Sequence, residues 1–376
     1  MSSPLQRLGP GQLVPAAGVL IAGGVLMVWS ASAVQAGLRF GSSTVYLWRH
    51  LEGLALGVAL GAIAWRIPPS ALRRAAPIAW LTAFGLLAAT YSPLGLAENG
   101  ARRWLSIGPL TLQPLEPAKL AVILGLSAWL ARAGPRLRDW RQSLAVPALL
   151  AGGPALLLLG QPDFGGALML AALCAALAFA AGARGSHLAI AGGIGLPLVA
   201  LLAVARSYRV ARLGALLDPW SDPFGSGYQL IQSLIGFGSG HLVGVGLGVG
   251  QQKLGFLPEA HTDFILSVIG EELGLVGVLG ILLAFLVLGL AALGIASRAR
   301  DPFAMLVATG VGAMLSVQGA VNAGVAMGVL PTTGTTLPLV SYGRSSLICS
   351  VVALGWVLSI ARNPQPRSRA RGGRWR

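Results

Sequence analysis

Runs of about 20 apolar residues recur along the whole chain, separated by short segments that contain Arg, Pro or polar clusters. A helix of this length crosses the hydrocarbon core of a bilayer. The pattern predicts ten transmembrane helices, near 13–34, 48–65, 75–93, 115–131, 143–160, 164–182, 187–205, 264–296, 303–330 and 337–361. We therefore expect an all-α polytopic membrane protein that forms a single transmembrane domain over residues 1–376.

The eighth run is too long for one straight crossing. Its first turns are predicted to lie at the interface or in an irregular entry, with the membrane span nearer 273–296. The longest polar connection, 206–263, precedes it and is expected to form short helices along the outer membrane face. The glycines between Gly236 and Gly255 lack the spacing of a phosphate-binding loop, so we interpret them as positions of close packing and backbone freedom.

The distribution of basic residues predicts the orientation. Only 10% of the residues are charged, against roughly 25% in a soluble domain. Placing both termini in the cytoplasm puts seventeen Lys and Arg residues on that side and nine on the other, which agrees with the positive-inside rule. We interpret the basic tail 362–376 as a topology and anionic-lipid feature. Nucleic-acid binding is disfavoured, because the basic residues are spread loop by loop and no binding domain accompanies them.

Four of the twelve acidic residues lie between 258 and 274, at the edge of the eighth apolar run: Glu259, Asp263, Glu271 and Glu272. Charges at the edge of hydrocarbon are costly and favour a functional interpretation. Thr262 or Asp263 is predicted to cap the following helix, and a helix N-terminus would lower the pKa of Asp263 and keep it ionised. Glu271 and Glu272 are more readily interpreted as a hydrogen-bonded brace at the entry of the span.

Two other places carry ionisable residues beside apolar runs. Glu116 and Lys119 are three residues apart on one predicted helix face, which permits an internal ion pair. Two interpretations are open: the pair only reduces the cost of two charges, or Lys119 faces a cavity and meets an anionic ligand. Asp163, in a Gln-Pro-Asp turn, is either the N-cap of the sixth helix or part of a polar site.

The segment 331–346 is rich in Thr and Ser and is broken by Pro and Gly. It is typical of a discontinuous or re-entrant segment, which a membrane tolerates only where protein or a water-filled cavity satisfies the backbone. Its hydroxyls, Ser341 among them, could receive a phosphate-rich lipid headgroup together with nearby cations. The candidate cations are Arg102, Arg103, Lys119 and Arg344.

Several sequence blocks resemble those of one known family. They are Asn-Gly-Ala-Arg-Arg-Trp at 99–104, Gln-Pro-Asp-Phe-Gly at 161–165, Asp-Pro-Phe-Gly-Ser-Gly-Tyr-Gln at 222–229, and the stretches 258–274 and 331–346. Together they resemble the SEDS proteins, the FtsW/RodA/SpoVE polymerases of bacterial cell-wall synthesis, over nearly the whole chain. The blocks look more like FtsW and SpoVE than RodA. Two positions depart from the family pattern: Leu115 stands where Ser is usual, and Arg344 where Gly is usual.

The resemblance implies a peptidoglycan glycosyltransferase that polymerises lipid II at the outer face of the bacterial cytoplasmic membrane during cell division. It implies a class B penicillin-binding protein as partner, beside other divisome membrane proteins and membrane lipids. By resemblance Asp263 is the catalytic residue, and Glu116, Lys119 and Asp163 line or support the same cavity. Glu259, His261 and Thr262 flank Asp263 and are expected to support it. Charge alone suggests a divalent cation, Mg²⁺ or Mn²⁺, as a cofactor.

Two other functions are open on the sequence. A transporter or lipid flippase would also use about ten spans with buried charges and a broken helix, although its site is expected near the midplane. A scaffold that recruits division enzymes without chemistry would tolerate replacement of Asp263.

Overall fold

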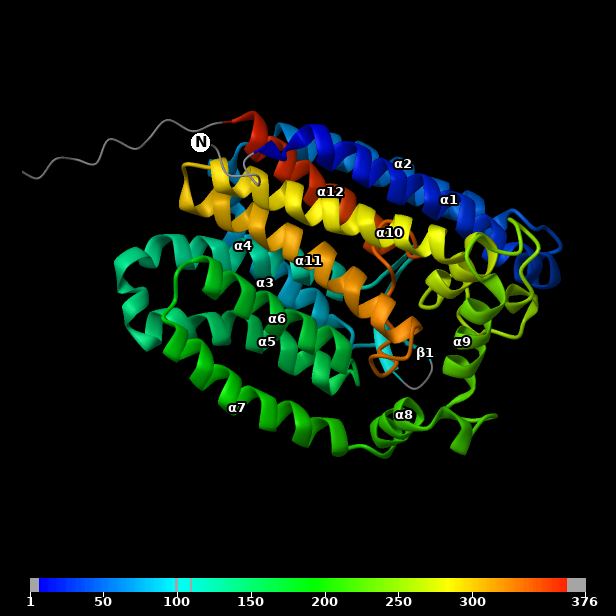
Figure 1. The fold of residues 1–376 in the computed structure, drawn as a ribbon. Helices are drawn as coiled ribbons and strands as arrows, with labels where there is room; N and C mark the ends of the chain where they lie inside the picture. Colours follow the sequence, from blue (N-terminus) through cyan, green and yellow to red (C-terminus); the bar gives the residue numbers. More distant parts are fainter. Residues whose placement is uncertain (1–6, 99–100, 109, 364–376) are drawn as a thin grey trace, which may run out of the picture.

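The computed structural model describes residues 7–98, 101–108 and 110–363. Asn99 and Gly100 of the first family-like block, and the basic tail after Asn363, lie outside the described residues. Within the described residues, ten long helices form the body of the molecule (Figure 1). They are α1 Pro10–Phe40, α2 Val45–Arg66, α3 Pro69–Ala89, α4 Leu115–Ala133, α5 Val146–Gly160, α6 Phe164–Ala180, α7 Gly185–Val204, α10 Ile265–Arg298, α11 Pro302–Ala326 and α12 Arg344–Arg362.

Eight helical segments of the described chain are long and apolar enough to cross a membrane. The apolar helix α6 is shorter than those eight, and α3 is not among them. The protein is therefore a helical multi-pass membrane protein, as the apolar runs predicted, and the number ten stays a prediction. Several predicted boundaries are wrong: the first helix extends to Phe40, the third is Pro69–Ala89, and the largest difference is at the start of the tenth. The ninth helix ends at Ala326, and the tenth begins only at Arg344, because residues 327–343 form turns and irregular backbone.

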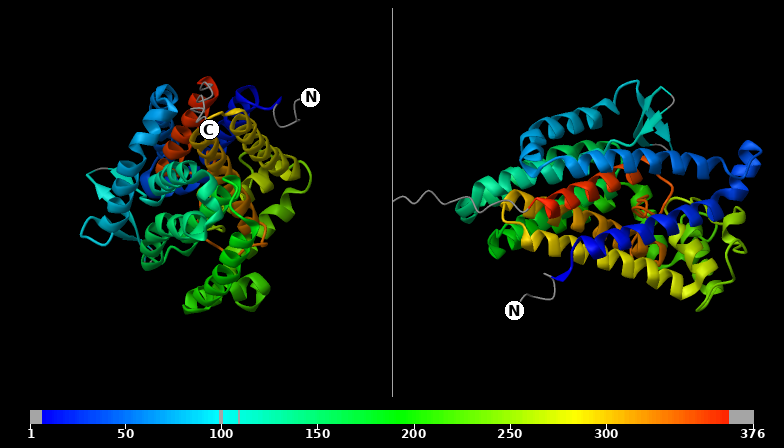
Figure 2. Two further views of the ribbon diagram at one scale, coloured as in Figure 1. Left: turned by 90° about the vertical axis from the view of Figure 1, so that its left-hand side faces the viewer. Right: turned by 90° about the horizontal axis from the view of Figure 1, so that it is seen from above.

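The strands and the short helices α8 and α9 gather at one end of the helical bundle (Figure 1). A small antiparallel sheet consists of β1 Gly95–Glu98, β2 Ala101–Ile107 and β3 Leu110–Leu112, with β2 in the middle. The predicted long connection contains α8 Ser207–Leu217 and α9 Tyr228–Gly240. The first turn of α1 and the last turn of α12 lie together at the opposite end (Figures 1 and 2).

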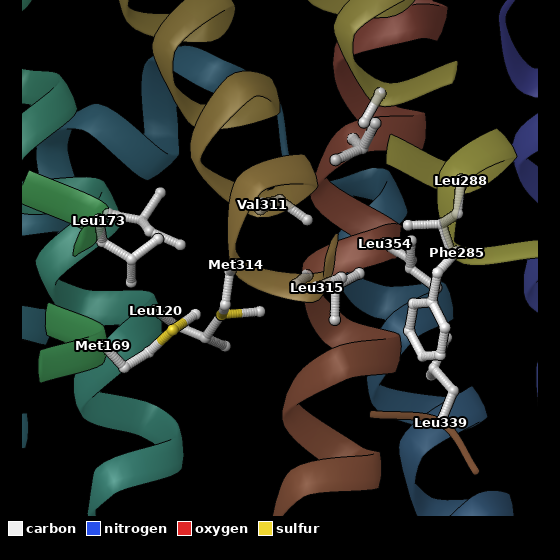
Figure 3. Packing of buried hydrophobic residues seen from close by; sticks show 14 of the residues in the cluster. Leu120, Met169, Leu173, Phe285, Leu288, Val311, Met314, Leu315, Leu339 and Leu354 are labelled. Carbon is white, nitrogen blue, oxygen red and sulfur yellow. The ribbon is translucent and has the colours of Figure 1, made fainter. Parts of the chain in front are cut away.

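The hydrophobic core lies between α4, α6, α10, α11 and α12. Figure 3 shows Leu120 and Met169 beside Met314, and Leu288 near Phe285 and Leu354. Interior side chains at native packing density hold the helices in fixed relative positions. Helix α11 runs through this cluster, so the polar side chains on its C-terminal turns are carried by a rigid element.

Helix α10 is broken at Gly274, which has φ 66° and ψ −164°. A Cβ at this position would lie 2.5 Å from the carbonyl oxygen of Leu242. Only glycine therefore allows the loop that contains Leu242 to come this close to α10. Residues 265–273 thus form a separate short helix before the long span. The break agrees with the predicted start of the span near 273.

The loop 241–252 inserts into this break and satisfies its backbone. Val245 N and Gly246 N donate to the carbonyls of Glu271 and Glu272, at 2.9 and 3.1 Å. In the other direction, the amides of residues 275 and 276 donate to the carbonyls of residues 241 and 242. Since hydrocarbon offers no hydrogen-bonding partner, the loop takes the place of the missing helical turn.

Glu271 and Glu272 use their side chains to hold the same loop. The Glu271 carboxylate accepts from Gln251 N and Gln252 N, at 2.8 and 3.1 Å. The Glu272 carboxylate accepts from Gly248 N and from the Lys253 ammonium, and the pair with Lys253 measures 2.6 Å. Ser30 of α1 bridges the two charges by hydrogen bonds. These contacts are those of a brace between α1, the loop and α10.

Replacing Lys253 with Met should lower the stability of the protein markedly. Breaking a buried ion pair leaves one uncompensated charge, which costs about 3–5 kcal/mol. The Glu272 side chain is 0% exposed, so it has no access to water for compensation. The measurement is the unfolding temperature in detergent, with the exposed Arg74→Met as the matched control. Equal unfolding temperatures for Lys253→Met and Arg74→Met would contradict the role of this pair.

Candidate active site

Asp263 lies in a tight turn before α10 and does not cap the helix. The turn is closed by the amides of Thr262 and Phe264, which donate to Glu259 O at 3.2 Å. Glu259 itself has φ 56°, a strained conformation for a residue with a Cβ. The N-cap of α10 is Phe264, without a side-chain cap bond, and the Thr262 hydroxyl donates to the Glu259 carboxylate. The prediction that Thr262 or Asp263 caps α10 was wrong.

The segment 337–342 holds this turn in place. The Ser341 hydroxyl donates to Thr262 O and accepts from Leu337 N. Tyr342 N donates to His261 O at 2.9 Å, and the His261 ring packs against the ring of Tyr342. Both hydrogen-bonding roles of Ser341 are therefore used inside the protein. Its contacts are those of a support for the Asp263 turn.

Two arginines converge on Asp263 from separate elements. Arg103 comes from β2 and donates to Pro162 O, while Arg212 comes from α8 and donates to Thr332 O at 2.7 Å. A Cβ at Gly334 would lie 3.5 Å from Arg103 Nη1 and 3.7 Å from Asp263 Oδ2, so both groups flank the same glycine. Gly334 has a positive φ of 74°, which glycine adopts without strain, and this conformation brings the backbone of the segment 333–336 close to both groups.

Burial raises the pKa of Asp263 to about 7, from an ordinary value of 3.8. The negative charges of Glu259 and Asp163 raise it further, whereas Arg103 and Arg212 oppose the shift. The prediction of a lowered pKa was wrong, because the carboxyl is not at the helix cap and loses most of its hydration. Asp263 is thus poised to exchange a proton near neutral pH.

A cavity of about 80 Å³ lies beside this cluster. Glu116, Lys119 and Asp163 all line it, together with Gln318 and the segment 333–336. The Lys119 ammonium is 2.9 Å from the Glu116 carboxylate and donates to Gln318 Oε1 at 2.6 Å. The predicted ion pair is present, and it faces a cavity. Asp163 both caps α6, by accepting from Gly166 N at 3.0 Å, and lines the cavity.

Two of the predicted cations lie apart from these groups. Arg102 is exposed, since neighbouring residues of a strand point to opposite faces and Arg103 takes the inner one. Arg344 opens α12 and packs its side-chain stem against Gly53 of α2. Neither residue lines the cavity.

Sequence reasoning missed Arg212, Gln318 and Asn322. Arg206, Arg209 and Arg212 recur every three residues, a spacing that would have indicated a basic face on a short helix. Gln318 and Asn322 stand four apart in an otherwise apolar span, where buried amides indicate hydrogen bonds across helices.

The charged groups at Asp263 do not form a metal cage. No group of three His, Cys, Asp or Glu side chains among residues 7–98, 101–108 and 110–363 is placed to hold a metal ion. Mg²⁺ is commonly held by one or two carboxylates and completed by waters and substrate phosphates. A divalent cation at Asp263 would therefore need waters and substrate phosphates to complete its coordination. The predicted divalent cation stays a prediction.

Comparison with known proteins identifies the family. A family model described as cell cycle protein FtsW/RodA/SpoVE matches residues 12–365. The chain belongs to the FtsW/RodA/SpoVE family. Two curated relatives are named probable peptidoglycan glycosyltransferase FtsW. The protein from Nitrosococcus halophilus is 44% identical over 352 residues, which cover 93% of this chain and 91% of the relative. The protein from Thioalkalivibrio sulfidiphilus is 43% identical over 355 residues, with coverages of 93% and 89%.

Solved structures show the same FtsW/RodA/SpoVE fold. One similar chain comes from a structure described as the structural coordination of polymerization and crosslinking by a peptidoglycan synthase complex. It matches with a TM-score of 0.77 and 35% identity over 94% of this chain and 97% of that chain. The rod shape determining protein RodA of Thermus thermophilus matches with a TM-score of 0.68 and 31% identity over the same shares. The resemblance read from the sequence blocks is therefore confirmed at the level of the family.

The ionisation of Asp263 should respond to its charged neighbours in opposite directions. Glu259→Gln removes a negative charge and lowers the pKa of Asp263, whereas Arg212→Gln removes a positive charge and raises it. A pH titration of the Asp263 carboxyl band by infrared difference spectroscopy, assigned with Asp263→Asn, measures both. The exposed Arg206→Gln is the control. Shifts of the same sign in Glu259→Gln and Arg212→Gln would contradict the described arrangement.

Proposed function

We propose that this protein is a peptidoglycan glycosyltransferase, which polymerises lipid II during cell division with Asp263 as the general base. The observation that supports it most directly is a partly buried carboxyl with a pKa of about 7 between two arginines, in a fold shared with proteins of cell-wall synthesis. The names of the curated relatives support the reaction class.

In the proposed step, the Asp263 carboxylate takes the proton of the acceptor sugar 4-hydroxyl. The acceptor oxygen forms a bond to the anomeric carbon of the donor, and the bond from that carbon to the pyrophosphate oxygen breaks. Undecaprenyl pyrophosphate leaves with the electron pair. A positioned base contributes typically 10²–10⁴-fold, and it works best when its pKa is near the operating pH. The raised pKa makes Asp263 a stronger proton acceptor than an ordinary carboxylate.

Charge on the leaving pyrophosphate needs cations close to the base. Arg103 and Arg212 are the cations that act on Asp263 most strongly, and each already donates to a backbone carbonyl, which fixes its direction. Guanidinium groups held in this way stabilise developing negative charge without reorganisation. Lys119 is paired with Glu116, so it adds less net positive charge to the site.

The cavity offers a route for a lipid-linked substrate. Its wall between α6 and α11 includes Leu168 and Val317, which are also exposed on the apolar surface of the bundle. A prenyl chain could remain in the bilayer while the headgroup enters beside them. The 80 Å³ of the cavity holds only a few waters, at about 10–15 Å³ of such volume each. Binding of two sugar headgroups therefore requires the cavity to widen.

The proposal includes the surroundings of the enzyme. Both described helix ends at the termini lie on one side of the bundle, and the positive-inside rule puts that side in the cytoplasm. The active site then faces outward from the bacterial cytoplasmic membrane. We propose a class B penicillin-binding protein as the partner, supported by the similar chain from a peptidoglycan synthase complex.

Replacing Asp263 with Asn or Ala should reduce glycan polymerisation from lipid II by about 10²–10⁴-fold, because the base is lost. The assay uses purified protein with its transpeptidase partner in detergent, and product length is read on a gel. Asp218→Asn, an exposed aspartate of the same long connection, is the matched control and should retain activity.

Full polymerisation by both Asp263 variants would sink the proposed mechanism. Two further assays separate the other functions. In sealed vesicles a flippase would move lipid II across the bilayer without making polymer. A scaffold would make no polymer in the detergent assay, and cells would tolerate Asp263→Ala.

A further inference from the structure

Helix α11 presents two buried amides, one turn apart, to the irregular backbone around the active site. Asn322 Nδ2 donates to Asp263 O at 2.8 Å and to Thr335 O at 2.7 Å. Its side chain is buried, with the residue 1% exposed. One side-chain amide thus joins the catalytic turn to the segment that walls the cavity.

Gln318 makes the neighbouring contact. Its Nε2 donates to Thr336 O at 3.0 Å, while its Oε1 accepts from the Lys119 ammonium. The two amides of α11 therefore hold consecutive carbonyls of the segment 333–336. Only Asn322 also reaches the turn that carries Asp263.

The hydrogen bonds of the Asn322 side chain are made by its nitrogen, Nδ2. Both of its N–H groups are engaged, while Asn322 Oδ1 is buried and has no partner among the described residues. A buried unpaired acceptor is unfavourable, so an apolar residue at 322 would have been the simpler choice if packing alone mattered. Two carbonyls that point to one place need a double donor.

We propose that Asn322 is a positioning residue, which fixes the main chain of Asp263 against Thr335 and so sets the catalytic carboxyl beside the cavity. This inference rests on the proposed function. Helix α11 is anchored in the core through Val311, Met314 and Leu315, so it provides a rigid reference for the turn. Catalytic groups held by such supporting contacts keep the geometry that the reaction needs.

Three variants test the proposal. Asn322→Leu removes both donors at similar size, and Asn322→Asp keeps the shape but opposes two carbonyls with oxygen. Ser316→Ala is the control, a polar-to-apolar change on α11 that faces Gly289 of α10. A misplacement of about 1 Å costs on the order of 10²-fold, so both Asn322 variants should lose about 10- to 100-fold in kcat. The KM for lipid II should change little, and Ser316→Ala should resemble wild type.

Two further measurements distinguish a positioning role of Asn322 from a role in folding stability alone. In the Asp263→Asn background, Asn322→Leu should cause no further loss of kcat, because residues that act as a unit are not additive. The Asp263 carboxyl band should titrate at lower pH in Asn322→Leu, since a loosened turn admits water and reduces the burial that raises its pKa. The titration midpoint of Asp263 reports on the position of its carboxyl without any turnover of substrate. The charged groups that act on this carboxyl are those of Glu259, Arg103, Arg212 and Asp163.

Wild-type kcat and a wild-type midpoint in both Asn322 variants would overturn the inference. A loss of activity that only follows the folded fraction, with an unchanged midpoint, would overturn it equally. If wild-type protein makes no polymer, the proposed function fails, and the titration midpoint alone then decides whether Asn322 positions Asp263.

Discussion

The constraint on which this structure depends is that backbone amides and carbonyls at membrane depth must find partners within the protein. The chain breaks its helical pattern twice near the site, at Gly274 and over residues 327–343. Loop 241–252 repairs the first break, and Asn322 with Gln318 pairs carbonyls of the second. These repairs place irregular backbone, which a plain helix cannot offer, beside the ionisable side chains.

The balance of burial and charge gives the site its chemistry. Asp263 loses hydration in the turn, which raises its pKa, and two arginines keep the ionised form accessible near neutral pH. The charges of Glu271, Glu272 and Lys253 are used in holding the loop, and none of the three is among the groups that shift the pKa of Asp263.

The sequence predicted the features that follow from local pattern. Apolar runs indicated the helices, the three-residue spacing indicated the Glu116–Lys119 pair, and clustered Pro, Gly and Thr indicated an irregular segment near residue 331. The sequence did not predict the features that depend on contacts between distant segments of the chain. Nothing local reveals that Arg212 from α8 and Arg103 from β2 meet Asp263, or that burial outweighs the helix N-terminus in setting its pKa.

The most direct test of the central claim is the pH dependence of kcat/KM for polymerisation by the purified complex. A base must be ionised to accept a proton, so activity should fall as the pH drops through about 7, the pKa of Asp263. Arg212→Gln should move that midpoint to higher pH, and Arg102→Gln should leave it in place. A profile that stays flat down to the ordinary range of aspartate would contradict Asp263 as the general base.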